Sequence, residues 1–253
     1  MKKLLLIFTV IGLIVCLFVG CTPTVPTEGE GEGEGEGEPE PVDRVVLVEL
    51  FTQWGCASCE VVEPILEQLA GEYERSELIL VEERAYSIYS LDEIRDRYNW
   101  YLPNSADRST PNTLFNGLNQ KIHGSSNYST LKTKIDTELG KEAKIAVTAT
   151  RDSDSNTTAI TGTIENISSV TLDNLVINGM TYKDRGETGL RYSVTDIFAE
   201  QQVEVSTLAP GDTYNFSFNL EGFDWDANNI HGVIFVQDID SSKKEILQAI
   251  YVD

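Results

Sequence analysis

Two cysteines separated by two residues are the part of this 253-residue sequence best suited to chemistry, Cys56 and Cys59. Apolar side chains at helical spacing begin directly after them, which places the pair at the start of a helix. The unpaired N–H groups and the dipole at a helix N-terminus favour a thiolate, the attacking species in disulfide exchange. A second thiol one turn later can resolve the mixed disulfide by closing a small ring. The spacing therefore predicts a redox pair in which Cys56 attacks and Cys59 resolves.

The same spacing also occurs in half of a zinc site and in inert disulfides. Zinc requires four ligands, and outside the N-terminal leader, which contains Cys16 and is closed by Cys21, the other soft ligands in the sequence are His123 and His231. We therefore expect no metal and no cofactor at the pair, and we interpret His123 as an exposed hairpin residue rather than a catalyst. An inert disulfide in a domain kept only for binding stays open as an alternative.

Strands and helices alternate around the cysteine pair. Residues 45–52 form a near-continuous apolar run, which is typical of a strand buried on both faces. A capping box at residues 90–93 predicts the start of a second helix, and Asn116-Gly117 is a strong hairpin signal. The expected order of elements is strand, helix, strand, helix, strand, strand, helix. In this order they cover residues 45–52, 62–73, 77–85, 91–102, 113–115, 120–122 and 128–139. This order predicts an α/β domain with a parallel strand pair over residues 42–140.

This stretch resembles the thioredoxin superfamily at four spaced landmarks. Residues 56–66 (CASCEVVEPIL) look like the active-site helix of thioredoxin, including a proline five residues after the second cysteine. Residues 109–111 (STP) resemble the cis-proline loop, and Asn116-Gly117 with residues 123–124 match the hairpin and its following glycine. Residues 48–59 (VELFTQWGCASC) are closer still to a group of secreted thioredoxin-like proteins. The resemblance implies a thioredoxin-like fold for residues 42–140.

The resemblance also implies roles for residues outside the cysteine pair. Thr110 and Pro111 would face the substrate, because the matching loop pairs with substrate backbone in the superfamily. One loop residue aside, Glu49 aligns with the buried aspartate that serves thioredoxin as a proton acceptor; the alternative is a strand-end carboxylate that reaches water. Trp54 stands one place earlier than the tryptophan of thioredoxin, because Gly55 intervenes. Both residues are expected to border the substrate, unless Trp54 is simply a packing residue.

A period of two replaces helical periodicity after residue 140. Apolar and polar side chains alternate clearly over residues 145–149 and 214–220, and about seven strands with Gly, Asn and Asp turns are typical of a β-sandwich. The remaining apolar runs lie near residues 158–164, 172–180, 192–205, 233–236 and 246–252. Residues 208–212 (LAPGD) resemble a turn of many immunoglobulin-like surface modules, so an all-β Ig-like sandwich domain is expected over residues 141–253. Four aspartates are candidate turn caps or, alternatively, calcium ligands: Asp224, Asp226, Asp238 and Asp240.

The N-terminus has the features of an export signal. Two lysines precede an apolar run over residues 4–19, which is shorter than the roughly 20 residues of a membrane span. Residues 17–21 (LFVGC) resemble the bacterial lipobox, which implies removal of residues 1–20 and lipid on Cys21; an ordinary cleaved signal is the alternative. Residues 21–41 are rich in Gly and Glu and contain little to bury, so they are expected to form a disordered linker.

The net charge of the sequence and the expected location of the protein limit the classes of partner. A net charge of −22 repels phosphate backbones, so nucleic acid is not expected as a partner. The protein is expected to be extracytoplasmic and anchored to the bacterial membrane through lipid on Cys21. Thr22 gives no inner-membrane retention signal, which favours the outer membrane or the cell surface.

Two functions of different classes remain. The first is a membrane-anchored thiol–disulfide oxidoreductase that acts on protein thiols or disulfides. Ala57 and Ser58 offer a thiolate little stabilisation, and Glu60 and Glu63 oppose it, so the pair is expected to be reducing or mildly oxidising. The second is a non-catalytic surface-binding lipoprotein that uses a thioredoxin-like scaffold and an Ig-like interaction module.

Overall fold

The computed structural model of the protein describes residues 42–222 and 224–252. The expected signal peptide over residues 1–20, the lipidated Cys21 and the linker over residues 21–41 lie outside the described residues. In the part of the chain that is described, no helix has the length and apolar character needed to cross a membrane.

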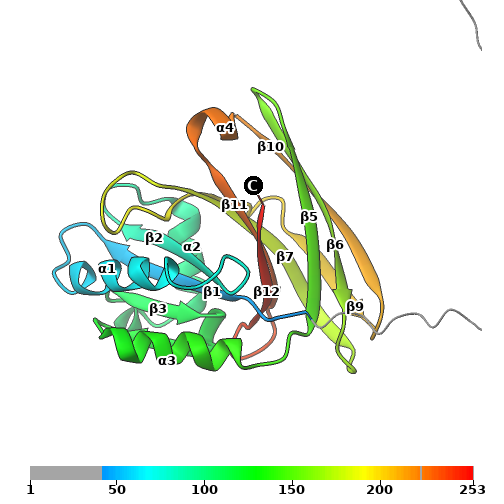
Figure 1. The fold of residues 1–253 in the computed structure, drawn as a ribbon, viewed down its shortest axis with the longest axis horizontal. Coiled ribbons are helices and arrows are strands. Elements are labelled where there is room, and N and C mark those ends of the chain that lie inside the picture. Colours follow the sequence, from blue (N-terminus) through cyan, green and yellow to red (C-terminus); the bar gives the residue numbers. More distant parts are fainter. Residues whose placement is uncertain (1–41, 223, 253) are drawn as a thin grey trace, which may run out of the picture. The chain divides into compact units, whose positions relative to one another are not determined.

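A mixed nine-stranded sheet runs through the structure in the order β12-β11-β7-β8-β2-β1-β3-β4, with β9 beside β7 (Figure 1). Its elements from the first half of the chain are β1 (Val46–Gln53), α1 (Cys59–Ala70), β2 (Leu78–Tyr86), α2 (Asp92–Tyr101), β3 (Asn112–Phe115), β4 (Gln120–His123) and α3 (Tyr128–Leu139). Short 3-10 turns at Ser105–Asp107 and Gly117–Asn119 precede β3 and β4. Strand β1 pairs in parallel with β2 and antiparallel with β3. The expected order of strands and helices over residues 42–140 is therefore present.

Strand β1 is buried on both faces, as its continuous apolar run predicts. On one face, Val48 and Leu50 pack in a cluster with apolar residues of α1 and α3. On the other face, Leu47 and Phe51 belong to a cluster that includes residues of α2. Because β1 ends just before the cysteine pair, these two cores hold in place the strand that leads into the pair.

The second half of the chain contributes to two layers. Strands β5 (Ile145–Ser153), β6 (Thr157–Asn166) and β10 (Thr213–Glu221) form a separate three-stranded sheet. The other strands of the second half extend the large sheet: β7 (Leu172–Lys183), β8 (Ser193–Ile197), β9 (Val203–Leu208), β11 (His231–Asp238) and β12 (Ile246–Val252). A short helix, α4 (Trp225–Asn228), precedes β11. One apolar cluster draws its residues from both layers, so the described strands after residue 140 lie in two sheets that pack together.

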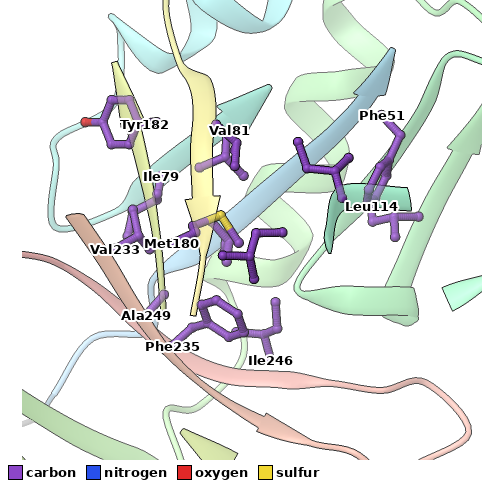
Figure 2. Packing of buried hydrophobic residues seen from close by; sticks show 14 of the residues in the cluster. Phe51, Ile79, Val81, Leu114, Met180, Tyr182, Val233, Phe235, Ile246 and Ala249 are labelled. Carbon is purple, nitrogen blue, oxygen red and sulfur yellow. The ribbon is translucent and has the colours of Figure 1, made fainter. Parts of the chain in front are cut away.

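The two halves of the chain are not separate, however. Strand β8 lies between β7 and β2, where the backbone N–H of Glu82 donates to the carbonyl oxygen of Tyr192 at 2.8 Å. Figure 2 shows the core that results, with Met180, Tyr182, Val233, Phe235, Ile246 and Ala249 from the second half packed among Phe51, Ile79, Val81 and Leu114 from the first. The described residues accordingly form one compact unit. The physical reason is that β8 pairs with β2 at Glu82 and the apolar side chains of both halves share one core.

The beginning and the end of the described chain also meet. The backbone N–H of Val45 donates to Gln248 Oε1 at 2.8 Å, and Gln248 Nε2 donates to the carbonyl oxygen of Asp43 at 2.9 Å. Gln248 lies on β12, the last strand, whereas Val45 immediately precedes β1. The side chain of Gln248 therefore fastens the segment that leads into β1.

Two local expectations differ from the structure. The run over residues 192–205 is split between β8 and β9, because turns at Ala199 and Gln201 interrupt it. The capping box at residues 90–93 is not formed: Leu91 is the N-cap of α2 and makes no side-chain cap. Ser90 Oγ instead donates to the carbonyl oxygen of Ala85 at 3.1 Å, which ties the end of β2 to the start of α2.

Candidate functional site

A disulfide joins Cys56 to Cys59 where the loop after β1 enters α1. The helix begins at Cys59, so Cys56 lies in the turn before it rather than in its first turn. The backbone N–H of Cys59 nevertheless reaches Cys56 Sγ at 3.2 Å, and this N–H would stabilise a thiolate there. Cys59 is 1% exposed whereas Cys56 is partly exposed, so an incoming substrate can reach only the first sulfur directly.

The loop before β3 lies against the exposed sulfur. The Thr110–Pro111 bond is cis, which confirms the expectation from the sequence. The carbonyl oxygen of Thr110 lies 3.7 Å from Cys56 Sγ, and Thr110 Oγ1 lies 3.8 Å from it. Pro111 is buried and Thr110 is partly exposed. The structure thus brings the expected substrate loop to Cys56.

Asn112 holds this loop in place, a role that the sequence did not reveal. Its side-chain amide is fully buried and donates to the carbonyl oxygens of Ser109 at 2.9 Å and Asp107 at 3.1 Å. His123 is exposed and its ring nitrogens contact Asn112 Oδ1 and Ser109 Oγ. His123 therefore buttresses the loop from the hairpin, and neither of these contacts is with a cysteine.

Trp54 and Gly55 lie on the open side of the pair. The side chain of Trp54 is 56% exposed, so it is not a packing residue of the core. Gly55 has a φ of 71°, a conformation that favours glycine, and its neighbourhood is open. The backbone N–H of Trp54 donates to Ser87 Oγ at 3.0 Å and so connects it to the loop after β2. Three further large side chains are exposed at the end of β2 and in that loop, Tyr86, Ile88 and Tyr89; with Trp54 they are called here the hydrophobic rim.

Glu49 is fully buried on the other side of β1. It pairs with Arg97 and accepts a hydrogen bond from Tyr101 at 2.8 Å, both residues of α2. It therefore does not reach water, which removes the alternative of a solvent-exposed strand-end carboxylate. Glu83 of β2 also interacts with Glu49. The role of Glu49 as a proton acceptor for the cysteine pair stays a prediction.

A second buried acid lies much closer to the cysteines along the chain. Glu63 is on α1, one turn after Cys59, and is 4% exposed. Its Oε1 lies 3.1 Å from Arg84 Nη1. Burial raises the pKa of Glu63, and Arg84 opposes this increase. The sequence contained one indication of this pair, the charged residues 82–84 inside an otherwise apolar strand.

A segment from the second half of the chain closes this buried cluster. Gly189 accepts a hydrogen bond from Arg84 Nη2 at 2.7 Å through its carbonyl oxygen and donates its N–H to Glu67 Oε1 at 2.6 Å. Glu67 also pairs with Arg191. Helix α1, which begins at Cys59, is therefore bound to the segment between β7 and β8.

The four candidate calcium ligands are used otherwise. Asp224 caps α4, and Asp226 pairs with Arg151 at 2.7 Å. Asp238 accepts from the backbone N–H of Ser241, and Asp240 accepts from Asn174. Among the described residues, no group of three or more His, Cys, Asp or Glu side chains is arranged to hold a metal ion.

The described residues thus combine a mixed sheet with a Cys-x-x-Cys disulfide at a helix start and a cis-proline loop beside it. No protein-family model matches the sequence, and no curated protein matches it. The fold is shared with HBP35 of Porphyromonas gingivalis, with a TM-score of 0.63 and 12% identity over 83% of this chain and 74% of that one. It is also shared with protein AGR_C_4864 from Agrobacterium tumefaciens, with a TM-score of 0.53 and 17% identity over 83% of this chain and 94% of that one. A domain of the outer membrane lipoprotein Omp28 from Porphyromonas gingivalis overlaps with a TM-score of 0.32 at 18% identity over 44% of this chain and 88% of that one, which is too low to show a shared fold.

Proposed function

We propose that this protein is a membrane-anchored, extracytoplasmic thiol–disulfide oxidoreductase with a thioredoxin-like domain over residues 42–140. One observation carries the proposal: a partly exposed Cys56 is joined to a buried Cys59, and the carbonyl oxygen of Thr110 lies beside the exposed sulfur. An attacking thiol must be accessible and a resolving thiol must be protected from other partners. The difference in burial meets both requirements.

The chemistry is an exchange of two electrons between two sulfur pairs. In the reduced protein, the Cys56 thiolate attacks a substrate disulfide, forms a mixed disulfide and releases the first substrate sulfur as a thiolate. Cys59, after losing its proton, attacks Cys56 Sγ, which breaks the mixed disulfide and releases the second substrate sulfur. The protein is left oxidised with the Cys56–Cys59 bond, and the substrate has gained two electrons and two protons. The reverse sequence oxidises a dithiol substrate.

The substrate would lie along the Thr110–Pro111 loop. The backbone of Thr110 is directed towards Cys56, so a segment next to the loop would present its cysteine to that sulfur. Trp54 and Gly55 flank the opposite side, where an exposed indole and an open glycine leave space for a polypeptide. These features favour an extended protein segment as the substrate.

The surroundings of Cys56 favour a reducing or mildly oxidising pair. Within residues 42–222 and 224–252, the polar groups in contact with Cys56 Sγ are Ser58 Oγ, the Cys59 N–H and two oxygens of Thr110, and none of them carries a positive charge. A strongly oxidising pair requires a reduced form that is stabilised by such charges or by additional donors. Equilibration with glutathione, read by alkylation and mass shift, measures the potential, and a value near −120 mV would contradict this part of the proposal.

The proposed location of the protein is inferred from the signal peptide expected over residues 1–20. Lipid on Cys21 would anchor the protein at the outer membrane or cell surface, and residues 21–41 would hold the folded part away from the membrane. Mass spectrometry of membrane-extracted protein should show loss of residues 1–20 and an acylated Cys21. A free Cys21 thiol in the native protein would contradict this assignment.

The decisive experiment traps the substrate. A Cys59→Ser variant should accumulate mixed disulfides through Cys56, because the resolving thiol is missing. The matched control is the Cys56→Ser/Cys59→Ser double variant, which should trap nothing. Proteins released from the trapped species by dithiothreitol are the substrates. Absence of mixed disulfides in Cys59→Ser would favour the other function, a surface-binding lipoprotein in which the Ig-like sandwich contacts the partner and the disulfide is inert.

A further inference from the structure

Glu63 is the buried acid best placed to exchange a proton with the resolving cysteine. It follows Cys59 by four positions on α1, and residues at this spacing lie on one helix face with Cβ atoms about 5–6 Å apart. Both side chains are buried, at 1% exposure for Cys59 and 4% for Glu63. The two side chains are therefore neighbours on one buried face of α1, the arrangement that a proton transfer between them requires.

The carboxyl group of Glu63 is held but not saturated. Its Oε1 is buried and accepts no hydrogen bond of ordinary geometry, although Arg84 Nη1 lies 3.1 Å away. Arg84 is itself shared, because its Nη2 donates to the carbonyl oxygen of Gly189. Glu63 Oε1 is therefore held by the charge of Arg84 without a hydrogen bond of ordinary geometry.

The charges around Glu63 balance its two protonation states. On α1 it is flanked by Glu60 and Glu67, while Glu82 and Arg84 face it from β2 and Arg191 approaches through Glu67. Burial and the neighbouring glutamates raise the pKa of Glu63, and Arg84 lowers it. A raised pKa makes the carboxylate of Glu63 a stronger base towards a thiol than an ordinary glutamate.

We infer that Glu63 is the general base that deprotonates Cys59 when the mixed disulfide is resolved. The inference rests on the proposed oxidoreductase function. The proton of the Cys59 thiol moves to the carboxylate of Glu63, and the resulting thiolate attacks Cys56 Sγ. The Cys56–substrate bond breaks and its electron pair leaves on the substrate sulfur. When a dithiol substrate reduces the protein again, the carboxylic acid of Glu63 returns the proton to Cys59.

Glu49 is the rival candidate for this role. Its two oxygens interact with Arg97 and Tyr101 on the α2 side of β1, which leaves it less suited than Glu63 to accept a proton. Glu60 is on α1 but is exposed, so it has no advantage over bulk water as a proton acceptor. Glu60 therefore provides a matched control, an acid of the same helix.

The experiment distinguishes the reaction of Cys56 from the later reaction of Cys59. Reduced protein is mixed with 5,5′-dithiobis(2-nitrobenzoate) in a stopped-flow instrument, where attack by Cys56 releases the first coloured thiolate and resolution by Cys59 releases the second. In Glu63→Gln the second step at pH 6.5 should be slower by roughly a hundredfold, while the first step is unchanged. The difference should vanish at pH 10, where hydroxide deprotonates the thiol. Glu63→Asp should restore part of the rate.

Removing one charge from a buried ion pair can prevent folding. A second variant that removes both charges therefore allows the inference to be tested if Glu63→Gln does not fold. Glu63→Gln/Arg84→Met removes both charges, a change that buried pairs often tolerate. It should show the same slow second step with the same dependence on pH. Glu60→Gln should resolve at the wild-type rate.

The outcomes distinguish the inference from the proposed function. If wild-type protein releases no coloured thiolate, the oxidoreductase function fails. If it releases both equivalents and neither the single nor the double Glu63 variant changes the pH profile of the second step, only the assignment of Glu63 is overturned. A slow second step in Glu49→Gln alone would transfer the role to the acid on β1.

Discussion

Gly189 lies so close to Glu63 that a Cβ atom on this glycine would come within 2.3 Å of Glu63 Oε2. Its φ is 76°, so both the space and the conformation require glycine. The contact brings a segment of the second half of the chain onto the helix that carries the cysteine pair.

Gly189→Ala should therefore destabilise the protein by about 1–3 kcal/mol more than a control at Gly186. Gly186 lies in the same segment with a φ of 81°, but a Cβ there would meet no atom within 4 Å. The control should thus lose only the conformational cost of roughly 1 kcal/mol. Urea unfolding of both variants measures the difference, and equal losses would show that Glu63 and Arg84 move aside freely.

Arg84→Met should destabilise the protein by about 3–5 kcal/mol at pH 8, because it leaves Glu63 without its partner in a buried site. The side chains of Arg84 and Glu63 are 4% and 5% exposed. The loss should be smaller at pH 5, where Glu63 can become neutral. Arg95→Met is the control, since Arg95 and its partner Asp92 are 42% and 79% exposed and such pairs contribute at most about 1 kcal/mol. A similar loss in both variants, measured by urea unfolding, would contradict the prediction.

Glu83→Gln should stabilise the protein at neutral and alkaline pH and change little near pH 4. Glu83 is fully buried, and burial together with the nearby Glu49 raises its pKa well above the usual 4.5. The stability that neutral Glu83 provides is present below the unfolded-state pKa and is lost as the pH rises towards the folded-state pKa. Glutamine keeps the shape without this loss. Thermal unfolding from pH 4 to pH 9 should show a flatter decline for the variant, and parallel curves would disprove the assignment; exposed Glu221→Gln is the control.

Trp54→Ala should lower kcat/KM for a disulfide-bonded peptide by roughly tenfold, with little effect on stability. Exposed tryptophans at binding surfaces often dominate affinity, and Trp54 is 56% exposed beside the cysteine pair. The rate with a small aromatic disulfide reagent should stay near wild type, because that reagent does not extend onto the hydrophobic rim. Val170→Ala, at the same 56% exposure but in the turn between β6 and β7, should change neither rate. Equal rates of peptide reduction in the Trp54 variant would exclude the rim from substrate binding.

Much of the first half of the fold was predictable because its signals are local. The apolar run of β1, the helical stripe of α1 and the turn at Asn116 each specify an element within a few residues. Asn116 indeed adopts a φ of 48°, and its buried side chain also accepts the N–H of Leu47 at 2.8 Å. The cis bond before Pro111 was predictable from the resemblance to thioredoxin.

The joining of the two halves was not predictable in this way. Alternation in residues 192–205 indicates strand, but it does not say which strand will be the neighbour of β8. The contact between Glu82 and Ser193 is a single parallel bridge between distant parts of the chain. Glu63 was noted only as a charge that opposes a thiolate, because the residues that bury it, Arg84 and Gly189, are remote in sequence.

The link between Gln248 and Val45 has a consequence for how the protein reaches its folded state. The chain leaves the ribosome with its N-terminus first, yet the segment that leads into β1 receives hydrogen bonds from β12 at the other end. The large sheet therefore cannot close until nearly the whole chain is present. Sheets that depend on such distant pairings form slowly. Under the proposed export, Cys56 and Cys59 would thus meet the redox conditions and folding factors outside the cytoplasm while the sheet around them is still open.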